Sequence, residues 1–266
     1  MSQRTRFTFA PSVCARLVAL FLFVAVMIPL HTAASERGKA TGKALRFNPY
    51  EFGVWAEVTP SPAPSPAQSV VAIHTNVLPD GRVLFWGANF AGQTTAQIWH
   101  PTNNTLTNAN HTGASLFCGG HAFLPDGRLL VTGGQTTLFA GIPNTTFFDF
   151  NNNSWSYNAA NDMNAGRWYP SNVSLGNGEL LVAAGTYCRS FSLDGSCTRW
   201  ANNPLPQVWQ TNGGWRNLYG ANLELTTYPW MYLASNGKVF LAGPLKYTGF
   251  LNTSGTGAWE GPNPPS

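Results

Sequence analysis

Charged side chains are scarce in this sequence, at 10% of its 266 residues. Long solvated helices need many such side chains, so their scarcity argues against a helical protein. Glycine and proline are frequent, with 27 and 19 residues, and aromatic side chains make up 13%. This composition favours many short strands joined by tight turns, and it therefore predicts an all-β fold.

A basic surface for nucleic acid is also missing. The formal net charge is +4, but seven of the 15 Lys and Arg side chains precede residue 47, where Glu36 alone opposes them. The rest of the chain has 8 basic and 10 acidic side chains. Because that part is slightly acidic, we expect no nucleic-acid partner.

Only one long apolar run occurs, from Leu17 to Leu30, and three arginines precede it. Small residues follow it up to Ala34, which is typical of a secretory signal peptide over residues 1–34 with cleavage near Ala34. The alternative is a membrane anchor, but the run is short against the roughly 20 residues that a span needs. We expect a secreted, extracellular protein without a stable membrane anchor after cleavage.

One short pattern recurs four times between residues 69 and 266. Each copy has a half-apolar run, an Asp-Gly or Asn-Gly turn, a second β-rich run and a further glycine. The turn glycines are Gly81, Gly127, Gly178 and Gly237. Such turns are the strongest short hairpin signal, and strand repeats of about 40–50 residues are typical of β-propeller blades. Two more β-rich runs follow in each copy, so the sequence predicts four four-stranded blades.

The lead-in over residues 35–68 contains a short predicted strand at 53–58 and a Pro-rich connector. Propellers often close their ring by pairing a strand from one end of the chain with the blade at the other end. The surplus strand therefore indicates a partial propeller, about four blades of about seven, and a fragment of a larger protein. The alternative is a four-bladed ring that closes on itself.

The four cysteines differ in their expected roles. Cys14 leaves with the signal peptide, and the short spacing of Cys188 and Cys197 around a loop predicts a local disulfide. Cys118 then remains unpaired in a secreted protein. It is either a buried, inert thiol or a thiol bonded to a neighbouring side chain.

The alignment of the four repeats indicates which side chain lies next to Cys118. Counting eight residues back from each turn Asp or Asn gives Ala72, Cys118, Tyr169 and Tyr228. Equivalent positions on consecutive blades lie side by side around the axis, where propellers place their sites. We therefore expect Cys118 and Tyr169 to face each other at one end of the central channel.

The motifs around these residues resemble those of the secreted copper radical oxidases, the family of galactose oxidase and glyoxal oxidase. They are SLFCGG at 115–120, AGRWYPS at 165–171, and YPW at 228–230 with GKVFLAGP at 237–244. The resemblance implies a kelch-type propeller that holds one copper. It also implies a thioether between Cys118 and Tyr169, with Tyr169 as a copper ligand and radical site and Tyr187 as an aromatic ring stacked over the thioether.

The resemblance further implies oxidation of small aldehydes or primary alcohols, including carbohydrate-derived ones, with O2 reduced to H2O2. The family's other copper ligands have no match here, so we expect the chain to be inactive alone. His74, His121 and Tyr228 are candidates for lining the site, with a structural role as the alternative for each. The competing hypothesis is a secreted kelch propeller that binds glycans or a protein partner without catalysis.

Overall fold

A computed structural model describes residues 60, 70–88, 92–135, 140–244, 246 and 248–261. The chain divides into two compact units, 1–56 and 57–266, and all described residues belong to the second. The expected signal peptide, the strand at 53–58 and the Pro-rich connector lie outside the described residues. Within the described part, no helix is long and apolar enough to cross a membrane.

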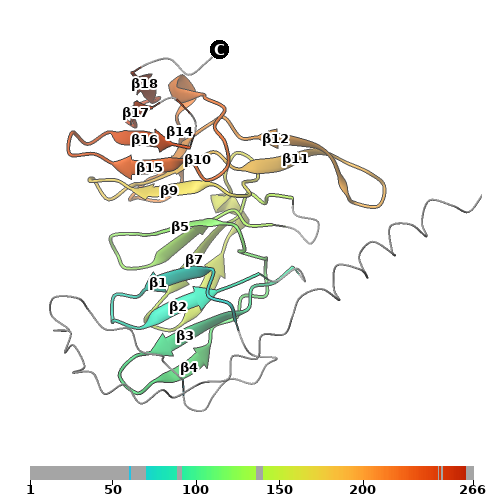
Figure 1. Cartoon of the computed structure of the whole chain (residues 1–266), viewed down its shortest axis with the longest axis vertical. Helices are drawn as coiled ribbons and strands as arrows, with labels where there is room; N and C mark the ends of the chain where they lie inside the picture. Colours follow the sequence, from blue (N-terminus) through green and yellow to red (C-terminus); the bar gives the residue numbers. More distant parts are fainter. Residues whose placement is uncertain are drawn as a thin grey trace, which may run out of the picture. The chain divides into compact units, whose positions relative to one another are not determined.

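Four antiparallel four-stranded sheets make up most of the described part (Figure 1). The first contains β1 (His74–Val77), β2 (Val83–Trp86), β3 (Ala96–His100) and β4 (Thr105–Asn108). The second contains β5 (Gly120–Phe123), β6 (Leu129–Thr132), β7 (Thr145–Asp149) and β8 (Ser154–Tyr157). The third contains β9 (Ser171–Ser174), β10 (Leu180–Ala183), β13 (Gln207–Trp209) and β14 (Trp215–Asn217). The fourth contains β15 (Trp230–Leu233), β16 (Val239–Gly243), β17 (Gly249–Asn252) and β18 (Ala258–Glu260).

Helical structure in the described part is limited to short 3-10 turns, η2 (Ala159–Asn161) and η3 (Tyr219–Ala221). The all-β prediction is therefore confirmed. In each sheet the strands pair with their neighbours in chain order, and every pair is antiparallel.

The first hairpin of each sheet turns at a predicted Asp-Gly or Asn-Gly pair. The four turn glycines have φ between 77° and 85°, a left-handed backbone that glycine adopts without steric cost. The Asp or Asn before each glycine accepts a hydrogen bond from the backbone N–H two residues further on, at 3.0–3.1 Å. Local turn chemistry therefore fixes the register of all four hairpins.

One segment differs from the prediction of a loop between the two cysteines. Residues 186–202 form a separate hairpin, β11 (Thr186–Phe191) and β12 (Cys197–Asn202), inserted between β10 and β13. Much of both strands is exposed, so the apolar alternation that marks a half-buried strand is absent. The predicted disulfide is confirmed, because Cys188 and Cys197 are bonded across this hairpin.

Tryptophans of the outer strands join neighbouring sheets. Trp155 of β8 donates its indole N–H to Ala109 O at 2.6 Å and packs on the apolar cluster that the first and second sheets share. Trp215 of β14 and Trp259 of β18 make equivalent contacts with the second and third sheets. Each of these rings therefore packs between consecutive sheets.

The first strands of consecutive sheets lie next to each other. β9 contacts β5 on one side and β15 on the other (Figure 1). The residues that lead into β5, β9 and β15 therefore lie close together, because they stand at the same end of adjacent strands.

Candidate functional site

A series of hydrogen bonds links His74, the first residue of β1, to the residues that precede β5, β9 and β15. The Cys118 N–H donates to Nε2 of His74 at 3.1 Å. The Tyr169 N–H donates to Cys118 O at 2.8 Å, and the Tyr228 N–H donates to Tyr169 O at 2.8 Å. The residue that leads into each sheet is thus hydrogen-bonded to its neighbour in the preceding sheet. His74, Cys118, Tyr169 and Tyr228 therefore form one continuous cluster.

Three of these residues share an uncommon backbone conformation. φ is 62° at Cys118, 63° at Tyr169 and 47° at Tyr228, in the left-handed region that costs a non-glycine residue roughly 1–2 kcal/mol. Such strain persists only where the surroundings over-determine it, and it concentrates at functional sites. Its recurrence at three equivalent positions makes this cluster the candidate site.

The Cys118 thiol and the Tyr169 phenol are in contact. Cys118 is 3% exposed, and this burial raises the pKa of its thiol. The hydrogen bond with Cys118, followed by burial, raises the pKa of Tyr169 to about 12. Both groups are therefore protonated at neutral pH, and the thiol lies within hydrogen-bond reach of the phenol oxygen.

Two aromatic rings flank Tyr169. The Trp168 ring lies 4.4 Å from it between centroids, with 31° between the ring planes, and Tyr228 meets it edge-on at 4.9 Å. The Tyr228 hydroxyl donates to Gly119 O at 3.3 Å, and burial raises the pKa of that hydroxyl above its ordinary value. Trp168 also interacts with the Cys118 thiol, so it contacts both members of the pair.

Tyr187 has a different setting from the ring expected over the Cys–Tyr pair. It lies in β11, where its hydroxyl accepts a hydrogen bond from Arg189 Nε at 3.2 Å. The Arg189 guanidinium lies 5.9 Å from the centre of its ring. Among the described residues, the rings in contact with Tyr169 are those of Trp168 and Tyr228. Sequence reasoning missed Trp168, although it directly precedes Tyr169 in AGRWYPS.

Arg167 anchors this motif from inside the protein. Its side chain is fully buried, and its guanidinium donates to Ala184 O at 2.7 Å and to Leu205 O at 2.6 Å. It also donates to the side-chain oxygens of Asn164 and Gln207. Burial lowers the pKa of Arg167 to about 9, so it stays charged at neutral pH. These bonds fix the backbone from which Trp168 and Tyr169 project.

His74 and His121 belong to a packed aromatic group. His74 stacks on Trp86 with centroids 4.9 Å apart, and His121 meets His74 edge-on at 5.3 Å. Burial lowers the pKa of each histidine to about 4, and His121 further disfavours the charged form of His74. Since Nε2 of His74 accepts the Cys118 N–H, the ring is neutral with its proton on Nδ1.

The described residues do not by themselves fit a copper ion. They contain no group of three His, Cys, Asp or Glu side chains that could hold a metal. Near Tyr169 they supply the phenol of Tyr228, while the His74 nitrogen that faces the cluster is already hydrogen-bonded to Cys118. Copper prefers imidazole ligands, so a complete copper shell needs groups beyond those described.

An open pocket of about 480 Å³ lies over the starts of the first strands. His74, His121 and Tyr228, the three predicted lining residues, border it. Its other walls are Ile73 and the segments 119–120, 170–172 and 229–232, which directly follow Cys118, Tyr169 and Tyr228. Its size suits a small organic molecule.

The chain was compared with known proteins, and no family model matches it. Two galactose oxidase sequences from Gibberella zeae are 25% identical to it over 194 residues, which is 66% of this chain and 27% of theirs. A solved structure described as a novel fungal alcohol oxidase of the AA5 family, in complex with copper, is 26% identical. Its TM-score is 0.55, over 71% of this chain and 40% of that one.

This chain thus spans about a quarter of the length of the curated relatives that it matches. The similarity in sequence and fold agrees with the resemblance of the Cys118 and Tyr169 motifs. The chain is related to the copper radical oxidases, the family of galactose oxidase.

Proposed function

We propose that this protein carries the radical half of a secreted copper radical oxidase. The four sheets act as four blades of a kelch-type propeller, and Tyr169 is the redox-active residue at its centre. The observation that carries the proposal is the contact between the Cys118 thiol and the Tyr169 phenol, within a strained, hydrogen-bonded cluster.

The thioether forms between Cys118 Sγ and the Tyr169 ring carbon next to the hydroxyl. The new C–S bond replaces the thiol S–H and one ring C–H, so two protons and two electrons leave the protein. O2 accepts both and becomes H2O2, which balances the step. The contact between the thiol and the phenol supports this bond, because the two groups are already neighbours.

In the mature oxidase the sulfur substituent makes removal of an electron from Tyr169 easier. Trp168 packs on the Tyr169 ring and Tyr228 meets that ring edge-on, so both hold the phenol in one orientation. Arg167 keeps the motif in place through buried hydrogen bonds. These residues position the tyrosine, and copper, held with the help of residues beyond those described, would supply the partner for one-electron chemistry with O2.

The proposed substrates are small aldehydes or primary alcohols, including carbohydrate-derived ones, with H2O2 as the second product. The pocket beside the cluster has a suitable size and is lined by neutral histidines and aromatic rings. The remaining copper ligands come from residues beyond those described, so the chain alone is expected to be inactive. The matched region is 27% of galactose oxidase, which supports the proposal that the other copper ligands lie in a different part of the whole enzyme.

The test is a peroxide-coupled assay on methylglyoxal and glycolaldehyde, using copper-loaded protein in which this chain is joined to the remainder of an oxidase. Tyr169→Phe and Cys118→Ser should each abolish or strongly reduce H2O2 release. Tyr219→Phe is a matched control, because Tyr219 is 64% exposed and remote from the cluster in sequence and contacts. Full activity in Tyr169→Phe contradicts the proposal.

A further inference from the structure

The neighbouring sheets are also joined at the turn ends of their strands, and the first junction is closed by an arginine. Arg82 follows the first Asp-Gly turn and reaches the β7–β8 turn of the second sheet. Its Nη2 donates to Phe150 O at 2.5 Å, and its Nη1 donates to Asn153 Oδ1 at 2.7 Å. Direct hydrogen bonds therefore join these two sheets at their turns.

The junction between the third and fourth sheets is closed in the same way. Arg216 donates to Thr253 O at 2.8 Å and to Gly255 O at 2.6 Å, both in the β17–β18 turn. It also pairs with Glu179, which occupies in the third sheet the turn position that Arg82 has in the first. A guanidinium again bridges the two sheets.

The junction between the second and third sheets lacks such a bridge. Arg128 is the counterpart of Arg82, but its Nε and Nη2 bond to Asp126 of its own turn, both at 2.7 Å. In the described part of the chain, Nη1 of Arg128 has no hydrogen-bond partner. By the register of the strand pairs, Thr211 O is the counterpart of Phe150 O and Thr253 O. No arginine among the described residues donates to Thr211 O.

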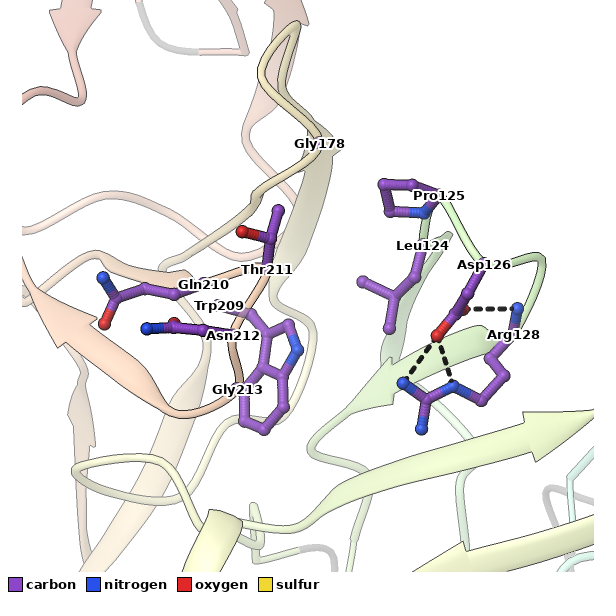
Figure 2. Close-up of a pocket in the computed structure, with 10 residues that line it drawn as sticks. All are labelled: Leu124, Pro125, Asp126, Arg128, Gly178, Trp209, Gln210, Thr211, Asn212 and Gly213. Atoms are coloured by element: carbon purple, nitrogen blue, oxygen red, sulfur yellow. Dashed lines mark hydrogen bonds and ion pairs between the residues drawn. The ribbon is translucent and has the colours of Figure 1, made fainter.

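A pocket of about 340 Å³ occupies the place of the missing bridge (Figure 2). Leu124, Pro125 and Trp209 form its apolar part. Figure 2 shows the nitrogen-bearing edge of the Trp209 indole turned toward the side where Leu124 and Arg128 lie. Polar groups of two turns face each other across it, namely Asp126 with Arg128 and the segment 210–213.

The polar groups of this pocket are preorganised for a ligand. Asp126 and the Phe147 ring, 5.0 Å from the guanidinium, hold Arg128 in place. The side chains of Gln210, Thr211 and Asn212 make no hydrogen bond to another described residue, so their donors and acceptors remain available. Because Asp126 neutralises Arg128, the pocket favours a neutral ligand with many hydroxyl groups over an anion.

We propose that this pocket is a carbohydrate-binding site for a neutral mono- or disaccharide. Hydroxyl oxygens of the sugar accept from Arg128 Nη1 and the Trp209 indole N–H, and a sugar hydroxyl donates to Thr211 O. The ligand thereby replaces the bridge that Arg82 and Arg216 make at the other junctions. The pocket lies at the far end of β5 from Cys118, roughly 13 Å along a four-residue strand, and does not depend on the oxidase reaction.

The test is a 1H–15N NMR titration of the full chain with cellobiose and methyl β-galactoside. We expect a saturable shift of the Trp209 indole N–H with at least one of these sugars. Arg128→Ala should weaken binding about tenfold or more, because it removes a charge-assisted hydrogen bond and its anchor. Lys238→Ala is the matched control, since Lys238 has the same turn position in the fourth sheet, and it should leave the affinity unchanged.

A second variant tests the proposal independently, in case Arg128→Ala does not fold. Asn212→Ala alters an exposed turn side chain and should weaken binding severalfold without changing the urea unfolding midpoint. The proposal is overturned if neither sugar shifts the Trp209 signal, or if Arg128→Ala binds as tightly as the wild type. Tighter binding of glucuronate than of both neutral sugars also overturns it.

Discussion

The backbone N–H of Tyr169 donates to the carbonyl oxygen of Cys118 at 2.8 Å, and both residues have a left-handed backbone. Their side chains are in contact as well, since the thiol hydrogen-bonds to the phenol. Two sheets therefore hold the pair in position through main-chain bonds that do not involve either reactive group. The arrangement is a property of the folded chain and is ready before any covalent bond forms.

The first prediction concerns Arg167. Arg167→Met should destabilise the protein by about 3 kcal/mol, because it leaves the carbonyl oxygens of Ala184 and Leu205 without their donor. Urea unfolding followed by tryptophan fluorescence measures the change. Arg199→Met is the control: Arg199 is exposed on β12, and its replacement should alter stability by less than about 0.5 kcal/mol. A fully stable Arg167→Met variant would show that these bonds do not hold the motif.

The second prediction concerns acid stability. Burial lowers the pKa of His74 and of His121 to about 4 in the folded protein, against about 6.5 when unfolded. As pH falls below about 6.5 the unfolded chain binds protons that the folded chain does not, so stability is full above that pH and declines toward pH 4. The loss is at most about 3 kcal/mol per histidine.

The measurement is urea unfolding of the wild type and His121→Phe between pH 7.5 and 4.5. The variant keeps an aromatic ring against Trp86 and should lose less stability over this range. Identical pH dependence in both proteins would mean that His121 titrates normally when folded.

The third prediction concerns the β11–β12 hairpin. This hairpin pairs with no other named strand, and an isolated hairpin is marginally stable, so its disulfide keeps it closed. Replacing Cys188 and Cys197 together by Ser should accelerate proteolysis within residues 189–196. Amide exchange in β6 and β10 should stay slow, because these strands lie in the buried cores. Unchanged proteolysis of the hairpin would contradict this account.

The strand pattern could be predicted from the sequence because its causes are local. Asp-Gly and Asn-Gly pairs set each first turn, and alternating apolar residues mark the strands around it. The spacing of the repeats then brings Cys118 and Tyr169 to neighbouring sheets, which requires only that equivalent positions lie side by side.

The packing of Trp168 on Tyr169 could not be predicted in this way. Successive side chains of an extended strand point to opposite faces, which would separate the two rings. The left-handed backbone at Tyr169 breaks this alternation, and no sequence pattern predicts a left-handed backbone at a tyrosine. Arg167 was missed for a related reason, because a charged side chain is ordinarily expected at the surface.

The bond between Cys118 and Tyr169 is the central claim and has a direct measurement. Protein in which this chain is joined to the remainder of an oxidase is loaded with copper in the presence of O2, digested with trypsin and analysed by mass spectrometry. We predict one linked species containing both residues, lighter than the sum of the two peptides by two hydrogen atoms and absent from Cys118→Ser. Recovery of both peptides, separate and unmodified, from the copper-loaded protein would contradict the account.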